Sequence, residues 1–169
     1  MQFLCCFAHG AVVVAGTAVA KPEEQEPQEG RIIVMAVHDK TLQTVSALVV
    51  QGAVYDLCAT DSGRLIAGIN SRVCSFVWVT DSGQPKIVSE SSHTGHILAL
   101  YVKAKGEHVV VGDLMKSITL LQYTVTEGTG KLTEVAADSN ANWMTAVEMW
   151  DDQVSDILYC CSILCCCSQ

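Results

Sequence analysis

Short apolar runs closed by turn residues follow one another along most of the chain. β-branched and apolar residues dominate residues 30–37, 42–50, 53–59, 65–69, 73–79, 97–102, 108–111 and 117–125. The turn sequence Asp-Ser-Gly follows two of these runs, at 61–63 and again at 81–83. Runs of this length and spacing predict strands joined in hairpins. No segment shows a 3.6-residue apolar stripe between helix caps, so we predict an all-β fold.

The hydrophobic pattern also repeats at long range. Segments that begin at Gly52, Gly95 and Asn142 share their apolar positions, with steps of 43 and 47 residues. Similar steps separate other landmarks, 43 residues for Gly63 and Gly106 and 45 residues for Trp78 and Tyr123. A period of about 40–50 residues filled with short strands is typical of β-propeller blades. We expect Gly63, Gly83 and Gly106 to lie in turns, where glycine permits a positive φ.

The predicted fold is a partial, truncated β-propeller of about three blades, each an antiparallel four-stranded sheet. Closed propellers need about four to eight blades, and an open arc leaves apolar faces uncovered. We therefore expect a piece of a larger polypeptide; closure by a second chain is the alternative. Residues 12–152 are assigned to the propeller, residues 1–11 to an N-terminal segment and residues 153–169 to a cysteine-rich tail.

The composition fits buried sheets and argues against a nucleic-acid groove. Half of the 169 residues are hydrophobic, 17% are charged and the net charge is −8. Four acidic residues fall within residues 23–29, which we interpret as a solvated loop between strands. With no basic stripe, direct binding of phosphate is disfavoured. Residues 11–19 are predicted as a strand, with a secretory signal over residues 1–20 as the alternative, and no apolar run reaches the ~20 residues of a membrane span.

Candidate chemistry is sparse. His93, His96 and His108 have no carboxylate or cysteine at metal-ligand spacing, so we interpret them as surface or turn residues and expect no metal or cofactor. Asp113 is expected to stabilise a turn through its side-chain oxygen. Seven of nine cysteines lie near the two ends. The C-terminal cluster is interpreted as non-native translated sequence, with palmitoylation or a soft-metal site as alternatives.

Several segments together resemble one family, in order and at similar spacing. They are GRIIV (30–34), LQTV (42–45), GAVY (52–55), GHILALY (95–101), VVGDLMKS (110–117) and NANWMTAVE (140–148). These segments resemble the family of the large subunit of the UV-damaged-DNA-binding complex, and they are most similar to its plant and algal members. The resemblance covers roughly residues 12–152 and implies the N-terminal part of the third of three propellers. Residues 1–11 and 153–169 diverge from the family pattern.

The resemblance also implies a role. Members of this family are adaptors of cullin–RING ubiquitin ligases that function in DNA damage recognition and repair, in the nucleus and also the cytoplasm. One propeller holds the cullin, and the other two form a cleft for substrate receptors of the WD-repeat type. The cullin-binding propeller has no counterpart in this chain, DNA is reached through a partner subunit, and no membrane is involved. The matched receptor-binding positions are Tyr55, Leu57, Leu98, Leu100, Tyr101 and Trp143.

Alternatives remain at this point. Leu57 and Leu100 fit inter-blade packing as well as an interface, whereas Tyr55 and Trp143 carry polar groups typical of interfaces. The large subunits of splicing or cleavage and polyadenylation factors share the implied architecture, so an RNA-processing role is the alternative function. A propeller enzyme is a further alternative, but apolar and aromatic residues at the strand starts favour binding over catalysis. We therefore expect a non-catalytic scaffold.

Overall fold

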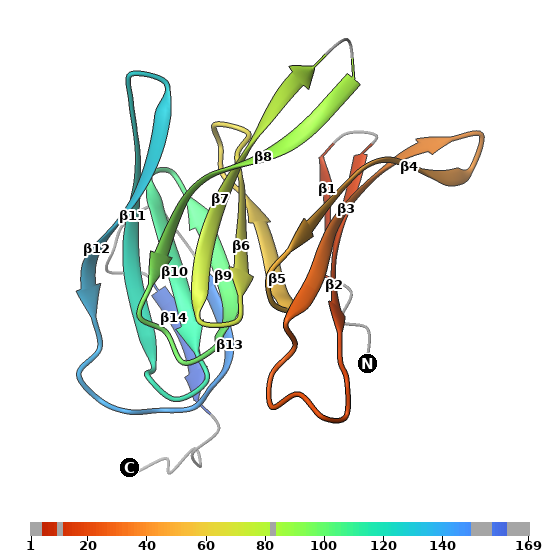
Figure 1. Ribbon diagram of the computed structural model, residues 1–169. Helices are drawn as coiled ribbons and strands as arrows, with labels where there is room; N and C mark the ends of the chain where they lie inside the picture. Colours follow the sequence, from red (N-terminus) through yellow and green to blue (C-terminus); the bar gives the residue numbers. More distant parts are fainter. Residues whose placement is uncertain (1–4, 10–11, 82–83, 150–156, 162–169) are drawn as a thin grey trace.

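The computed structural model describes residues 5–9, 12–81, 84–149 and 157–161, and in this part of the chain all regular structure is β (Figure 1). Three four-stranded antiparallel sheets follow one another along the chain, each in simple sequential strand order. The first blade contains β1 (Cys5–His9), β2 (Val12–Val19), β3 (Glu29–His38) and β4 (Thr41–Val50). The second contains β5 (Val54–Ala59), β6 (Leu65–Ile69), β7 (Arg72–Asp81) and β8 (Gln84–Thr94). The third contains β9 (Ala99–Lys105), β10 (His108–Asp113), β11 (Ile118–Thr126) and β12 (Thr129–Ala137).

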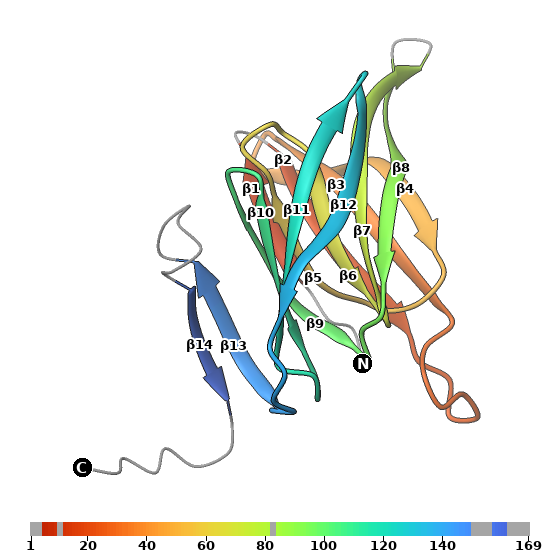
Figure 2. The same cartoon turned by 90° about the vertical axis from the view of Figure 1, so that its left-hand side faces the viewer.

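The predicted partial propeller of about three blades is confirmed. The three sheets stand side by side with their strands running roughly along a common direction (Figure 2). A further antiparallel pair, β13 (Met144–Met149) and β14 (Ile157–Cys161), packs beside the third blade. Strand β1 lies in the predicted N-terminal segment (residues 1–11), and β14 lies in the predicted C-terminal tail (residues 153–169). Residues 162–169, which include part of the cysteine cluster, lie outside the described part. No helix among the described residues is long and apolar enough to cross a membrane.

The inner and middle strands follow the predicted runs, whereas two outer strands were not predicted. Strand β6 coincides with the predicted run at Leu65–Ile69, and all of its residues are buried. Strands β8 and β12 have no such run because each shows mainly exposed, polar positions. In β8 only Ile87 is buried among the side chains described, and in β12 only Gly130 and Leu132 are. An outer strand with one half-solvated face carries too few apolar residues to be recognised by hydropathy alone.

The turns agree with the expected role of glycine. Gly63 and Gly106 lie between paired strands with φ of 77° and 58°. Such left-handed backbone is readily adopted by glycine and rarely by other residues. Gly83 lies outside the described residues, so its predicted turn stays a prediction.

Glycine also sets how closely the blades approach one another. Gly16, Gly68 and Gly112 occupy the second strand of successive blades. A Cβ atom at these positions would meet Val54, Ala99 and Val147, respectively, each on the inner strand that follows in the chain. Three apolar cores result among the described residues: one between the first and second blades, one between the second and third, and one between the third blade and β13. Because the second and third sheets each pack against a neighbour on both faces, the blades depend on one another for stability.

Candidate interaction surface at the linker end of the blades

Each blade is joined to the next by a short linker at one end of the sheets, which we call the linker end; it lies at the bottom of Figure 1. Buried turn residues with equivalent positions hold two of these linkers. Asn70, which follows β6, accepts a hydrogen bond from Ala53 N–H at 2.7 Å. Asp113, at the end of β10, accepts one from Ile97 N–H at 2.6 Å. A side-chain oxygen at the turn therefore fixes the start of each inner strand.

Asp113 organises this end of the third blade. Its side chain is fully buried, and its second oxygen accepts hydrogen bonds from the backbone N–H groups of Met115 and Lys116, at 2.8 and 2.9 Å. This pattern confirms the predicted turn-stabilising role, since a side-chain carboxylate that accepts from N–H groups two and three residues on forms an Asx-type turn. One carboxylate thus holds both the linker and the β10–β11 turn.

Exposed apolar side chains gather around the turn that Asp113 holds. Ile97 in the linker and Met115 in the turn are 42% and 43% exposed, and both of their N–H groups are bound to Asp113. Trp143 is 55% exposed, and the carbonyl of its neighbour Asn142 accepts a hydrogen bond from Ser117 N–H. Exposed Trp, Met and Ile on a rigid turn framework form the kind of surface that protein partners bind. Ile97 and Met115 were not among the candidate residues from the sequence.

The six candidate residues from the sequence differ in their surroundings. Leu57 is buried in the core between the first and second blades, at 4% exposed. Tyr101 is partly buried and packs against the apolar cluster of Val110, Leu120, Met144, Val147 and Met149. Tyr55, Leu98 and Leu100 are also partly buried, and Trp143 is the exposed member of the set. Of the six, Trp143 is the most accessible to a partner.

Electrostatics at this end involve two histidines. The sequence suggested that the three histidines lie at the surface or in turns; His96 lies in the linker between β8 and β9 but is buried there, which was not predicted. Its Nδ1 lies 3.7 Å from a carboxylate oxygen of Asp113, and its ring lies 5.5 Å from that of His93. Burial lowers the pKa of His96; His93 and Lys116 lower it further, while Asp113 and Glu134 oppose the shift. His96 is therefore neutral at physiological pH and packs as a core residue.

We expect this burial to make stability depend on pH. The folded chain binds a proton at His96 less readily than the unfolded chain, so the stabilisation is present above the ordinary pKa of 6.5 and is lost as the pH falls below it. Melting curves between pH 7.5 and pH 5 should show a steeper loss for the parent chain than for His96→Phe, which does not titrate. Parallel pH profiles of the two proteins would contradict this assignment.

No group of three or more His, Cys, Asp or Glu side chains in the described part is arranged to hold a metal ion. The Tyr55 phenol is half-buried, and burial together with the nearby Glu26 carboxylate raises its pKa, so it remains a neutral hydrogen-bonding group at physiological pH. The linker end thus presents exposed apolar side chains together with charged ones such as Glu26 and Lys116, a mixture that suits recognition of a protein surface.

Successive four-stranded antiparallel blades joined at one end define the chain as a segment of a β-propeller. It belongs to the family described as the CPSF A subunit region, whose model matches residues 8–161. The chain is 49% identical over 140 residues to DNA damage-binding protein 1a of Arabidopsis thaliana and to DNA damage-binding protein 1 of Oryza sativa subsp. japonica. It is 48% identical over 141 residues to DNA damage-binding protein 1 of Solanum lycopersicum. Each match covers 82% of this chain but only 13% of the relative.

Proposed function

We propose that this chain is a non-catalytic interaction module, part of the receptor-binding propeller of an adaptor for cullin–RING ubiquitin ligases in DNA damage recognition. The observation that carries the proposal is the long collinear similarity to DNA damage-binding protein 1 of several plants. In this proposal the protein acts in the nucleus and also in the cytoplasm. DNA is contacted indirectly, through a partner subunit, and the cullin through parts of the adaptor beyond this segment.

The partner of the linker end is a substrate receptor of the WD-repeat type. Ile97, Met115 and Trp143 supply exposed apolar area on turns held by Asp113 and Ser117. Aromatic and Met side chains on a rigid frame bind a partner helix or loop with little loss of entropy, and a few such residues carry most of the affinity. We further propose that Tyr55, Leu98, Leu100 and Tyr101 contribute along the inner strands, with Leu57 supporting them from the core.

Substitution of Trp143 tests this proposed function. In an adaptor that contains this segment in its complete form, Trp143→Ala should weaken receptor binding by about 2 kcal/mol, a roughly thirtyfold loss of affinity. Cullin binding should be unchanged because the two partners use different propellers. Binding isotherms for receptor and cullin, with a melting curve for each variant, measure the three quantities.

The matched control is Val135→Ala. Val135 is as exposed as Trp143, at 55%, but it lies in the outer strand β12 away from the linkers. Receptor binding by this variant should equal that of the parent. If Trp143→Ala lowers the melting temperature and weakens both partners together, Trp143 has a packing role and the receptor surface lies elsewhere.

A second candidate follows from the family itself, whose description refers to the CPSF A subunit. In this alternative the segment belongs to the large subunit of an RNA-processing complex. Affinity purification of the tagged endogenous protein separates the two functions. Recovery of cullin and WD-repeat receptors supports the adaptor, whereas recovery of cleavage and polyadenylation or splicing subunits supports the alternative.

A further inference from the structure

The outer strands of the three blades share an irregularity. In each blade one outer-strand residue has no register partner on the neighbouring strand: Val45 in β4, Glu90 in β8 and Val135 in β12. These residues are 45 positions apart, so they are equivalent. A bulge of this kind redirects a side chain. The two complete inter-blade contacts can therefore be compared position by position.

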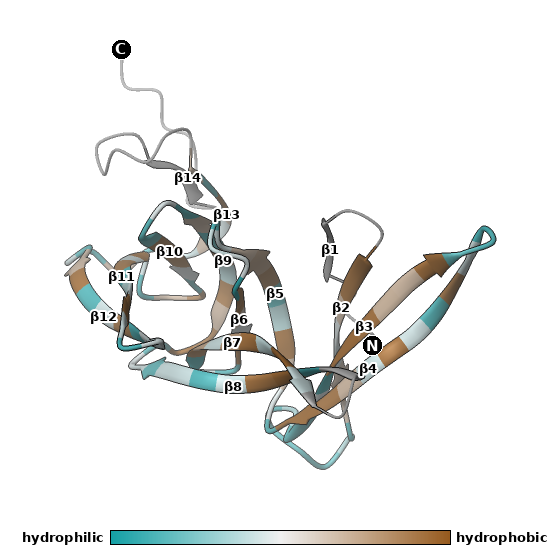
Figure 3. Cartoon of the chain, turned by 90° about the horizontal axis from the view of Figure 1, so that it is seen from above, coloured by the Kyte–Doolittle hydropathy of each residue, from teal (hydrophilic) through white to brown (hydrophobic). Residues whose placement is uncertain are grey.

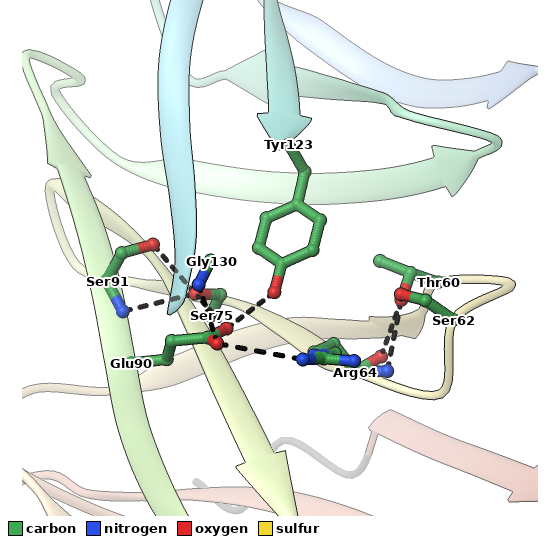
Figure 4. Close-up of polar contacts among 8 residues, drawn as sticks. All are labelled: Thr60, Ser62, Arg64, Ser75, Glu90, Ser91, Tyr123 and Gly130. Carbon is green, nitrogen blue, oxygen red and sulfur yellow. Dashed lines mark hydrogen bonds and ion pairs between the residues drawn. The ribbon is translucent and has the colours of Figure 1, made fainter. Parts of the chain in front are cut away.

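Between the second and third blades, the equivalent positions form a polar cluster of Arg64, Glu90 and Tyr123 (Figure 4). The Glu90 carboxylate accepts hydrogen bonds from the Tyr123 hydroxyl at 2.5 Å and from Gly130 N–H at 2.7 Å. Arg64 Nη2 lies 4.0 Å from the same carboxylate, whose side chain is only 5% exposed. The cluster joins the two blades near the β5–β6 and β11–β12 hairpins.

Between the first and second blades, apolar residues occupy the same positions. Val45 is equivalent to Glu90, and Trp78 precedes Tyr123 by the same 45 residues. Val12 corresponds to Arg64, since each lies four residues before the glycine that contacts the next blade. Instead of a polar cluster, this contact contains a crevice of about 570 Å³. Its apolar lining residues include Val12, Val14, Val34, Val45, Leu65 and Trp78, and the β5–β6 turn adds the charged residues Asp61 and Arg64. Trp78 and Val45 remain 38% and 40% exposed at this crevice.

The strand beside the crevice differs from its counterparts in charge. Residues between Lys40 and Asp56 include no charged side chain, and every side chain from Thr41 to Val45 is exposed. By contrast β8 carries Pro85, Lys86 and Glu90, and β12 carries Lys131 and Glu134. Figure 3 shows mostly hydrophobic positions along β4, whereas β8 combines a hydrophobic stretch with several hydrophilic positions. Charged residues and proline on an outer strand prevent further strands from adding to it, and β4 lacks both.

We propose that the outer edge of β4 binds an extended, uncharged segment of a partner protein, which adds as a fifth strand and places one large apolar side chain in the crevice. Strand β4 is the last strand of its sheet in the described part, so its outer backbone groups face away from β3. Main-chain hydrogen bonds supply affinity and the crevice supplies specificity. Arg64 also lines the crevice, and its Nε has no acceptor among the described atoms. This surface is separate from the linker end and does not depend on the proposed function.

Trp78 itself reports occupancy. In the full chain with Trp143→Phe and Trp150→Phe, Trp78 is the remaining tryptophan of the three. The probe is a blocked nine-residue peptide that alternates threonine and valine, with phenylalanine at the centre. Titration should shift the Trp78 emission to shorter wavelength and saturate. Replacing the central phenylalanine by alanine should weaken binding about tenfold or more, because a buried phenyl ring is lost.

Two variants of the chain test the two parts of the site. Val45→Glu copies the residue of the second blade into the crevice and should weaken binding at least about tenfold, since the carboxylate must be desolvated by the occupant. Its matched control, Val135→Glu, changes the equivalent residue of β12 and should leave binding unchanged. Gln43→Lys places a charge on the exposed edge of β4, where folding is not at risk, and should also weaken binding.

The outcomes separate the possible occupants. A peptide with proline at each position whose N–H would donate to β4 cannot pair in the proposed register, so binding equal to that of the parent peptide overturns strand addition in favour of an isolated apolar group. Binding that survives both Val45→Glu and Gln43→Lys overturns the site. Sedimentation that shows a dimer of the parent chain, abolished by Gln43→Lys, identifies a second copy as the occupant and overturns the partner segment.

Discussion

Replacing Gly68 by alanine is expected to lower the free energy of unfolding by about 3 kcal/mol, because a Cβ atom there would overlap the backbone carbonyl oxygen of Ala99. That carbonyl belongs to the inner strand of the third blade and cannot move without displacing β9. Ala99 N–H also donates to the carbonyl of Asn70 at 2.8 Å, which fixes the strand against the second blade. Denaturant titration followed by circular dichroism measures the loss.

Gly112→Ala is the matched control, since Gly112 occupies the equivalent position in the third blade. Its added Cβ would meet the side chains of Val147 and Tyr101, with Val147 Cγ2 at 2.6 Å. Side-chain atoms can rotate away where a backbone carbonyl cannot, so we expect a loss of only about 1 kcal/mol. An equal loss in the two variants would show that close approach of the backbones does not determine the spacing of the blades.

The sequence was sufficient to predict the all-β fold and the blade period because several strands, such as β6 and β10, are buried on both faces. Continuous apolar runs such as Leu65–Ile69 mark these strands clearly. The outer strands β8 and β12 were not predicted, because polar residues on their exposed faces interrupt the apolar run. Their bulges at Glu90 and Val135 were also beyond prediction, since a bulge is defined by the register with a partner strand.

The candidate residues of the surface came from the family resemblance. Trp143 was one of them, its polar group favoured an interface, and the structure leaves it exposed. Ile97 and Met115 are ordinary apolar residues in sequence, and their exposure results from the turn that Asp113 holds. Burial of His96 depends on the same turn. Which apolar residues face solvent is thus decided by tertiary hydrogen bonds that composition and spacing do not encode.

The second large expected effect on stability is at Glu90, in the polar contact between the second and third blades. Glu90→Ala should lower the free energy of unfolding by about 3 kcal/mol, because the Tyr123 hydroxyl and Gly130 N–H would remain buried without their acceptor. Arg64 would lose its nearby carboxylate as well. Glu90→Gln keeps one acceptor oxygen and should cost about half as much. Chemical denaturation of the three proteins gives these differences.

Alkaline pH provides an independent readout of the same cluster. Burial and the Glu90 carboxylate raise the pKa of Tyr123 from 10.0 to about 12. The unfolded chain therefore releases this proton first, and stability is present below pH 10 and falls as the pH rises towards 12. Glu90→Ala removes one of the two causes, so its stability should fall less steeply over this range. Glu29→Ala, which removes an exposed acid, should change stability by less than about 0.5 kcal/mol and leave the alkaline slope unchanged. A Glu90→Ala variant as stable as the Glu29→Ala control would show that apolar packing alone joins the second and third blades.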